Sequence, residues 1–556
     1  MQNFTSNPLG RERPGRLPLE TMAAGRRIAA VLTGLALVAA GCGGGHRAAA
    51  PPRALGVREP VPWRTDALDR VARARAEAAA VARRRATLAR LAGEGTVRAA
   101  LRRALLTGAI GRRSYDRYRR ALGGARRAAR LLTGSRLSEH AAVLASVDQL
   151  AADLRLTPSR LPAVFLNLRR NTRTWTQETF PAGGERRSWG DDPAVFQYIP
   201  GRGMQLHPLA TWSRVNWRLR HCLATRGSDC PRRRLARQLD ALARLPARRG
   251  RFVAWEYYYP YAQGTPPWIS GMAQATAVQA LARAGVALRA PRYMRLARRA
   301  LGAFETPPPA GVAVPAAGGR RFVMYSFAPA LQIINGELQA INGLRDAAVL
   351  GRSRRAARLV AGGDRAARRV LGGFDTGAWS LYSTAGGEST LAYHQLTTRI
   401  LAGLCRRTGR SAYCRAQRRF ARYETEPPRI GIAPLRGLWA HRSTPLHFSL
   451  SKGSAVQVRV YGPRGLVLAR DMLLGRGGHE LGWTPPSRGQ FRVRVSARGP
   501  EGRLGSSGRT VRVVRPKPRP KTRRDSKPKR GGRRDSKTER AERRGEAEES
   551  RPGGIG

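Results

Sequence analysis

The stretch Trp255–Ala282 reads WEYYYPYAQGTPPWISGMAQATAVQALA and sets a pattern that much of the chain repeats. Its first part is aromatic and β-prone, and the Pro/Gly run that follows must turn the chain. From Ser270, a residue suited to capping a helix, Met272, Val278 and Leu281 recur at helical spacing. Its first charge is Arg283, and because it has so few charges we expect this helix to be buried on most sides. Because a helix N-terminus favours anions, the aromatic strand would bring phenols to an anion-attracting position.

The same unit of strand, turn and neutral helix recurs along the chain. Neutral helices are expected to begin near Pro208, Ser270, Ala328 and Ser389, about sixty residues apart. More basic helices are expected to follow them at 231–245, 291–304, 352–371 and 411–423, and three of these lead into short aromatic strands at 252–259, 321–327 and 378–383. Such helix pairs cannot each bury an apolar face alone. The predicted fold is therefore mainly α with β, an (α/α) toroid of about four helix pairs with the neutral helices inside.

Four short motifs resemble one enzyme family. The segment Pro267–Ala275, PWISGMAQA, is similar to the signature of the D-glucuronyl C5-epimerase C-terminal domain. Tyr325–Gly336, Gly377–Tyr382 and Ala392–His394 resemble further elements of that family in the same order. The resemblance covers roughly residues 190–425 and implies an (α/α) barrel behind a β-rich part. The family commonly has an acid before the first tyrosine, where this chain has Met324.

The resemblance and the repeat together predict the site. The family's active-site tyrosines correspond to Tyr325, Tyr382 and Tyr393, which we expect to move the proton α to a uronate carboxylate. A phenol acts as a base there only if arginines and helix ends lower its pKa. The predicted substrate-binding residues are Tyr258, Trp268, Gln274, Asn335, His394, Arg202, Arg321 and Arg399. No cofactor and no metal is expected, since the chain has no CxxC and its histidines are scattered.

Other functions stay open at this point. A glycosidase of toroid fold would use two carboxylates, for which Glu256, Asp375 and Glu388 are the candidates. A polysaccharide lyase shares the α-proton abstraction and then eliminates. A surface lipoprotein could also bind an anionic glycan without turning it over.

The N-terminal part predicts export. Arg26 and Arg27 precede an apolar run, Ile28–Ala40, which is too short to span a bilayer. The run leads into Ala-Ala-Gly-Cys at 39–42, which looks like a bacterial lipobox, so residues 1–42 form a signal segment with Cys42 as the lipidated residue. We therefore expect anchoring to the outer face of the bacterial cell membrane, with 43–61 as a linker. An ordinary cleaved signal peptide is the alternative.

The remaining cysteines lie in two close pairs. Export favours the disulfides Cys222–Cys230 and Cys405–Cys414, each bridging a short turn between helices. Residues 62–165 have helical periodicity and form a predicted helical module. Residues 166–430 form the predicted epimerase-like domain, which opens with strand-like alternation at 172–180 and 195–199.

The C-terminal part differs from the preceding domain in its sequence pattern and composition. Residues 431–515 alternate in short segments that predict an Ig-like or fibronectin-III-like β-sandwich. Residues 516–556 are rich in Pro, Lys, Arg and Glu, and they are expected to be disordered and able to contact a cell-wall polymer. The formal charge of +67 comes almost wholly from arginine amid abundant Ala, Gly and Pro. That bias suits a GC-rich genome, so the expected partner is an anionic polysaccharide and not nucleic acid.

Overall fold

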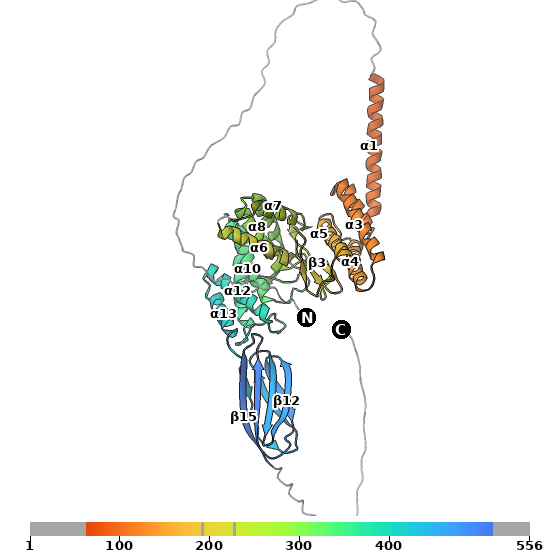
Figure 1. Ribbon diagram of the computed structural model, residues 1–556. Helices are drawn as coiled ribbons and strands as arrows, with labels where there is room; N and C mark the ends of the chain where they lie inside the picture. The colour runs from red at the N-terminus through yellow and green to blue at the C-terminus, as the bar shows by residue number, and fades with distance from the viewer. Residues whose placement is uncertain (1–62, 191–193, 226–228, 437, 515–556) are drawn as a thin grey trace, which may run out of the picture.

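The computed structural model describes residues 63–190, 194–225, 229–436 and 438–514, with side chains from residue 73 onward. An N-terminal helical part, a central helical domain and a C-terminal β domain follow one another along the chain (Figure 1). The predicted lipobox with Cys42 and the basic tail at 516–556 lie outside these residues. Within them, no helix has the length and apolar character needed to cross a membrane.

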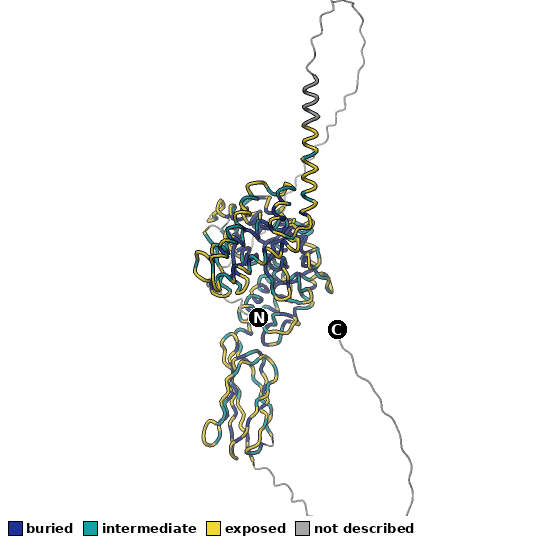
Figure 2. The backbone as a smooth tube through the Cα atoms, turned by 90° about the vertical axis from the view of Figure 1, so that its right-hand side faces the viewer, coloured by how far each residue is buried: buried dark blue, intermediate teal, exposed yellow. Residues whose placement is uncertain are grey.

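The N-terminal part consists of five helices. They are α1 (Trp63–Ala92), α2 (Val97–Leu106), α3 (Arg112–Leu131), α4 (Gly134–Ala152) and α5 (Leu161–Gln177). Helix α1 projects from the rest, and its described side chains are mostly exposed (Figures 1 and 2). The other four pack around buried residues such as Leu101, Leu122, Val143 and Phe165.

Helix α5 corrects the strand predicted at 172–180. Phe165, Leu168, Asn171 and Trp175 are all buried and recur every three or four residues, which places them on one face of a helix. The Asn171 amide donates to the backbone oxygen of Met204 and accepts from the indole of Trp175. These buried contacts outweigh the β-preference of the threonines between them.

A small antiparallel sheet connects this part to the helical domain. It contains β1 (Arg186–Arg187), β2 (Phe196–Ile199) and β3 (Gly203–Leu206), in that order. Gly203 has φ +74 and lies so close to α4 and α5 that an added Cβ would be 2.6 Å from a methyl of Val143. Only glycine fits this position, so β3 can pass close to the helices before it enters the next domain.

The helical domain contains four pairs of helices. The inner helices are α6 (Pro208–Ala224), α8 (Gly271–Ala287), α10 (Ile334–Leu350) and α12 (Leu391–Thr408). The outer helices are α7 (Arg232–Leu242), α9 (Pro291–Ala300, continued by the 3-10 turn Leu301–Phe304), α11 (Arg354–Val370) and α13 (Ser411–Tyr423). Every residue from Gly271 to Ala282 is buried, which confirms the prediction for α8. Helix α10 begins six residues after the predicted start because 328–333 forms a loop.

The four pairs form an open arc and not the closed toroid that the repeat predicts. Helices α6, α8, α10 and α12 pack against their neighbours in this order, but α6 and α12 share no comparable contact among the described residues. Strand β1 lies near the N-terminal ends of the inner helices. Arg186 of β1 lies close to both Tyr257 and Tyr393.

Short hairpins replace the predicted aromatic strands. They are β4 (Ala247–Arg249) with β5 (Phe252–Ala254), and β6 (Ala313–Ala316) with β7 (Gly319–Phe322). At 378–383 there are only single bridges, including Ile333 with Ser383. Both predicted disulfides, Cys222–Cys230 and Cys405–Cys414, are confirmed.

The C-terminal β domain is built from two sheets that share one core. One sheet has the order β13 (Gly477–Trp483), β10 (Thr444–Leu450), β8 (Ile430–Ile432). The other has the order β12 (Gly465–Leu474), β11 (Ser454–Gly462), β14 (Gly489–Arg498), β15 (Leu504–Val514), β9 (Leu438–Trp439). Side chains from both, among them Phe448, Val458 and Phe491, form the core. The β-rich nature of this region is as predicted, and its likeness to immunoglobulin domains stays a prediction.

Candidate functional site

The structure brings the three predicted catalytic tyrosines together. The rings of Tyr382 and Tyr393 have their centroids 4.8 Å apart, and the phenols of Tyr325 and Tyr393 both lie close enough to Tyr382 to affect its pKa. Tyr261, which the sequence analysis did not single out, has its ring centroid 5.5 Å from that of Tyr325 and acts to raise its pKa. Four phenols from four separate segments therefore form one group, which we call the tyrosine cluster: Tyr261, Tyr325, Tyr382 and Tyr393.

An aromatic wall supports this cluster from behind. Trp268 is buried, lies 5.8 Å from Tyr325 and stacks on Tyr257 at 4.1 Å between ring centroids. Its indole N–H donates to the backbone oxygen of Tyr259. Phe327 stacks on Tyr325 from another side. The predicted role of Trp268 in substrate binding is thus accompanied by a clear structural one.

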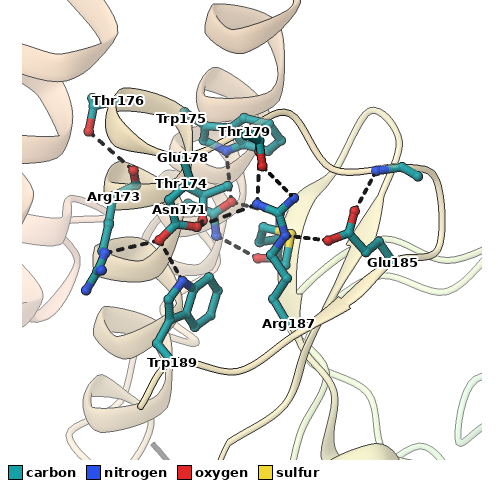
Figure 3. Close-up of polar contacts among 12 residues, drawn as sticks. Asn171, Arg173, Thr174, Trp175, Thr176, Glu178, Thr179, Glu185, Arg187 and Trp189 are labelled. Atoms are coloured by element: carbon teal, nitrogen blue, oxygen red, sulfur yellow. Dashed lines mark hydrogen bonds and ion pairs between the residues drawn. The ribbon is translucent and has the colours of Figure 1, made fainter.

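Arg186 is the cation beside the tyrosine cluster, and the sequence analysis missed it. It lies near Tyr393 and Tyr257, and its Nε donates to the Gln197 side chain at 3.2 Å. The next residue, Arg187, is held against the end of α5 by the backbone oxygen of Thr179 at 2.9 Å (Figure 3). Because successive residues of a strand point to opposite faces, fixing Arg187 on α5 turns Arg186 toward the arc.

Glu178 fixes this arrangement at the end of α5. Its carboxylate accepts from the indole of Trp189 at 2.6 Å and pairs with Arg173 at 3.1 Å, and it lies 3.6 Å from Arg187 (Figure 3). Arg187 also pairs with Glu185 at 2.6 Å. The position of Arg186 therefore depends on contacts outside the helical arc.

Burial raises the pKa of every phenol for which the structure resolves a shift in the cluster. For Tyr325 the next causes are the neighbouring phenols Tyr382 and Tyr261, and for Tyr382 burial again dominates. The pKa of Tyr393 is also raised, mainly by burial, although Arg186 acts in the opposite direction. In the free protein the effect of burial on the pKa of Tyr393 is therefore larger than the opposing effect of Arg186. The phenols are packed against one another, and within the part of the chain that the structure describes Arg186 is the cation acting on Tyr393.

The first turn of α10 contains two unusual polar groups. Asn335 is almost fully buried, and neither its amide nitrogen nor its oxygen has a hydrogen-bond partner. Ile333 provides no side-chain cap to α10, whereas α6, α8 and α12 are capped by His207, Ser270 and Thr390. The bridge from Ile333 to Ser383 places this turn beside the segment of Tyr382. An uncapped helix N-terminus with an unpaired amide is suited to an anionic group.

Glu337 lies two residues further along, still in the first turn of α10. Its carboxylate is buried and 3.7 Å from Arg321, and one of its oxygens has no hydrogen-bond partner. Burial raises the pKa of Glu337 to about 7. Arg321, a predicted substrate-binding residue, also donates to the backbone oxygen of Pro329.

The side chains of three other predicted substrate-binding residues make contacts within the protein. Gln274 accepts from the backbone N–H of Trp255 at 3.0 Å and donates to its oxygen at 2.8 Å. His394 is fully buried, with one ring nitrogen 2.8 Å from the Ser380 hydroxyl and the other 2.9 Å from the backbone oxygen of Phe420. Burial lowers the pKa of His394 to about 4. Tyr258 packs in the core beside Glu256, on the opposite side of its segment from Tyr257.

The other two predicted arginines lie apart from the tyrosine cluster. Arg202 is exposed in the turn between β2 and β3, and the backbone N–H groups on either side of it donate to Glu139 of α4. Arg399 is exposed on α12, almost two turns beyond Tyr393.

The three candidate glycosidase carboxylates are held in structural contacts. Glu256 is buried between Arg160 at 2.7 Å and Arg249 at 2.6 Å. Asp375 accepts from the Tyr423 hydroxyl at 2.9 Å and pairs with Arg419 at 2.7 Å. Glu388 accepts from the backbone N–H of Gly453 in the C-terminal β domain. Among the described residues, no group of three or more His, Cys, Asp or Glu side chains could hold a metal ion.

Fold and site together define an α-helical domain with a tyrosine-lined site at the N-termini of its inner helices. Residues 249–422 match the family model described as the D-glucuronyl C5-epimerase C-terminus, which confirms the resemblance inferred from the motifs. This segment contains Tyr261, Tyr325, Tyr382 and Tyr393 but not Arg186.

Two solved structures resemble the chain at low sequence identity. Cellobiose 2-epimerase from Bacillus thermoamylovorans is 10% identical, with a TM-score of 0.31 over 47% of this chain and 70% of that chain. Cellobiose 2-epimerase from Spirochaeta thermophila is 13% identical, with a TM-score of 0.32 over 52% of this chain and 73% of that chain. No curated protein sequence matches the chain.

Proposed function

We propose that the helical domain is a C5-epimerase-like enzyme that acts on uronic-acid residues of an anionic polysaccharide. The observation that carries the proposal is the close grouping of Tyr325, Tyr382 and Tyr393, with Arg186 beside Tyr393. The family match over 249–422 supports an epimerase-type carbohydrate enzyme. The carboxylates that a glycosidase would need are held in ion pairs and backbone contacts, so this alternative has less support.

Tyr393 is the proposed base and Tyr325 the proposed acid. Of the three catalytic candidates, only Tyr393 has a cation, Arg186, acting to lower its pKa. The phenolate takes the C5 proton, and the electron pair of the broken C–H bond moves into the carboxylate. The Tyr325 phenol then returns a proton to C5 from the opposite face. Tyr382 passes a proton from Tyr393 to Tyr325, which restores both residues.

The same site is suited to stabilise the negative charge that develops on the uronate carboxylate during proton removal. Removal of the C5 proton places a second negative charge on the carboxylate, and fixed donors that face it lower the barrier. The free N–H groups of α10 and the unpaired amide of Asn335 are the proposed donors, with Arg186 as the neighbouring cation. The residues named so far complete this proton exchange without a metal or cofactor.

The test is deuterium uptake at C5 from D2O, followed by NMR on uronate-containing polysaccharides. Tyr393→Phe is expected to reduce exchange by roughly 10²–10⁴-fold, as is usual for loss of a general base. Tyr413→Phe is the control, because Tyr413 is also buried but donates to Asp364 beneath the outer helices. Normal exchange in Tyr325→Phe, Tyr382→Phe and Tyr393→Phe alike would refute the mechanism.

The products distinguish the alternatives. An unsaturated product would indicate a lyase and new reducing ends a glycosidase. Binding without any chemical change would indicate a glycan-binding surface protein.

We further propose that the protein is exported and anchored through a lipid on Cys42 to the outer face of the bacterial cell membrane. The apolar run before Ala-Ala-Gly-Cys supports this location. Cys42→Ser should release the protein from membranes and abolish palmitate labelling. Full membrane retention of that variant, with no label in the wild type, would rule the anchor out.

A further inference from the structure

A cleft of about 830 Å³ lies in the N-terminal helical part, away from the tyrosine cluster. It is lined mainly by residues of α2 and α3. Leu91, near the C-terminal end of α1, also contributes to the lining. A cleft of this volume is large enough for several sugar units or another drug-sized ligand. None of its lining residues takes part in the proposed proton transfer.

The lining is strongly basic. Six arginines and two carboxylates, Glu94 and Asp116, give it a formal charge of +4. Asp116 is paired outside the lining with Arg112 at 3.2 Å, which reduces its effect on the cleft further. Of the arginines, only Arg126 has a recorded ion pair, with Asp148 at 3.1 Å. The arginines that line the cleft are Arg98, Arg102, Arg119, Arg120, Arg126 and Arg127.

The arginines of the lining are arranged in rows along α2 and α3 and are not gathered at one place. Arg119 and Arg126 are two turns apart on α3, about 10.5 Å along the axis, and Arg120 and Arg127 repeat that spacing. Across the cleft, Arg98 is one turn from Arg102 on α2. Rows of cations on facing walls suit an extended chain with repeated anionic groups better than one small ion. A concave wall of one sign also concentrates counter-ions more than a flat surface does.

The cleft also offers an aromatic face. Tyr115 is half-buried in the lining, and the guanidinium groups of Arg112 and Arg119 lie 5.8 and 5.9 Å from its ring centroid. Gly123 lies between the arginine pairs of α3, where an added Cβ would be 3.4 Å from the Arg127 guanidinium. A small residue there keeps the wall open between the two rows.

We propose that this cleft is a second binding site for the anionic polysaccharide, holding a stretch of polymer that is separate from the stretch in the tyrosine site. The arginine rows bind its carboxylate or other anionic groups, and Tyr115 contacts a sugar face. Two sites on one chain raise the effective concentration of the polymer at each. This inference rests on the proposed polysaccharide substrate, but its test measures binding and does not require catalysis.

The test compares two variants of the full chain with equal loss of charge. The cleft variant combines Arg98→Gln, Arg102→Gln, Arg120→Gln and Arg127→Gln, all at exposed guanidinium groups. The control combines Arg232→Gln, Arg233→Gln, Arg354→Gln and Arg358→Gln, which are exposed on the outer helices α7 and α11. The probes are fluorescent polygalacturonate chains, uncharged dextran and phosphatidylglycerol vesicles.

We expect the cleft variant to bind polygalacturonate at least about tenfold more weakly than the wild type, and the control variant to lose less than about twofold. Binding should weaken with salt, and dextran should not bind. Equal losses in both variants would show that only net charge matters and would overturn the proposal. Unchanged binding in the cleft variant, or binding of vesicles without polygalacturonate, would overturn it as well.

Discussion

The ammonium group of Lys452 in the C-terminal β domain lies 5.0 Å from the ring centroid of Trp379 in the helical domain. Lys452 is 1% exposed and donates to the backbone oxygens of Tyr423 and Glu426 and to the Glu501 carboxylate. Trp379 in turn stacks on His394 at 3.8 Å between ring centroids. The β domain thus supports the segment that leads to Tyr382.

Removal of this support should lower activity. The variant Lys452→Met with Glu501→Gln removes both partners, which avoids leaving a buried charge unpaired. We expect kcat for C5 exchange to fall about tenfold with little change in KM, because a small displacement of Tyr382 affects proton transfer more than binding. The matched control, Arg459→Met with Asp471→Asn, removes an exposed pair of the same domain. Equal activity of both double variants would show that the β domain does not position the site.

The rate of C5 exchange should rise with pH up to at least pH 10. The pKa of Tyr393 is above its ordinary value of about 10, so its phenolate fraction grows about tenfold per pH unit below that value. The buried phenols favour the folded state below pH 10, and this contribution is lost only as the pH rises further, so the fold should persist over the measured range. If a carboxyl group such as Glu337 were the base, the rate would level off above about pH 7.

Arg186→Gln should slow exchange about tenfold or more near neutral pH. Its guanidinium is the charge that lowers the pKa of Tyr393, so its loss leaves less phenolate. The Gln side chain keeps a polar group that can reach Gln197. Arg186→Lys restores the charge and should recover part of the rate, which a purely structural role in shaping β1 would not predict. A Lys variant as slow as the Gln variant would contradict this account.

The tyrosine cluster could be predicted because it depends on short motifs. Tyr325, Tyr382 and Tyr393 follow the repeat of strand, turn and helix, and local sequence determines that repeat. Arg186 could not be found this way, since its position depends on β1 lying between the end of α5 and Tyr393 of α12. The sequence did contain a signal for Arg186. Two adjacent arginines precede the strand at 195–199, and in a strand their side chains must point to opposite faces.

The direction of neighbouring side chains explains where His394 and Tyr258 lie. His394 and Tyr393 are adjacent in one motif, but consecutive residues of a helix point about 100° apart. Tyr393 therefore faces the cluster, whereas His394 faces Phe420 of α13. Tyr258 alternates with Tyr257 and so packs in the core beside Glu256. Sequence motifs identify the segments of a site, but they do not decide which of two neighbours enters it.

Asn335→Leu should make the free protein more stable and the enzyme less active. Asn335 is buried with both amide atoms unpaired, which costs about 1–3 kcal/mol, and Leu has nearly the same shape without that cost. A gain of about 1 kcal/mol corresponds to a rise of about 2–4 °C in Tm for a domain of this size. Exchange at C5 should fall at the same time, because the carboxylate loses a donor.

Asn216→Leu provides the matched control for this last prediction. Asn216 is also a buried asparagine on an inner helix, but its amide donates to the backbone oxygen of Thr276 at 2.8 Å and accepts from Arg283 at 3.3 Å. Its replacement should therefore lower Tm, because buried partners are left unpaired. A fall in Tm for both variants would mean that Asn335 is already satisfied in the free protein. It would then not be held ready for a substrate.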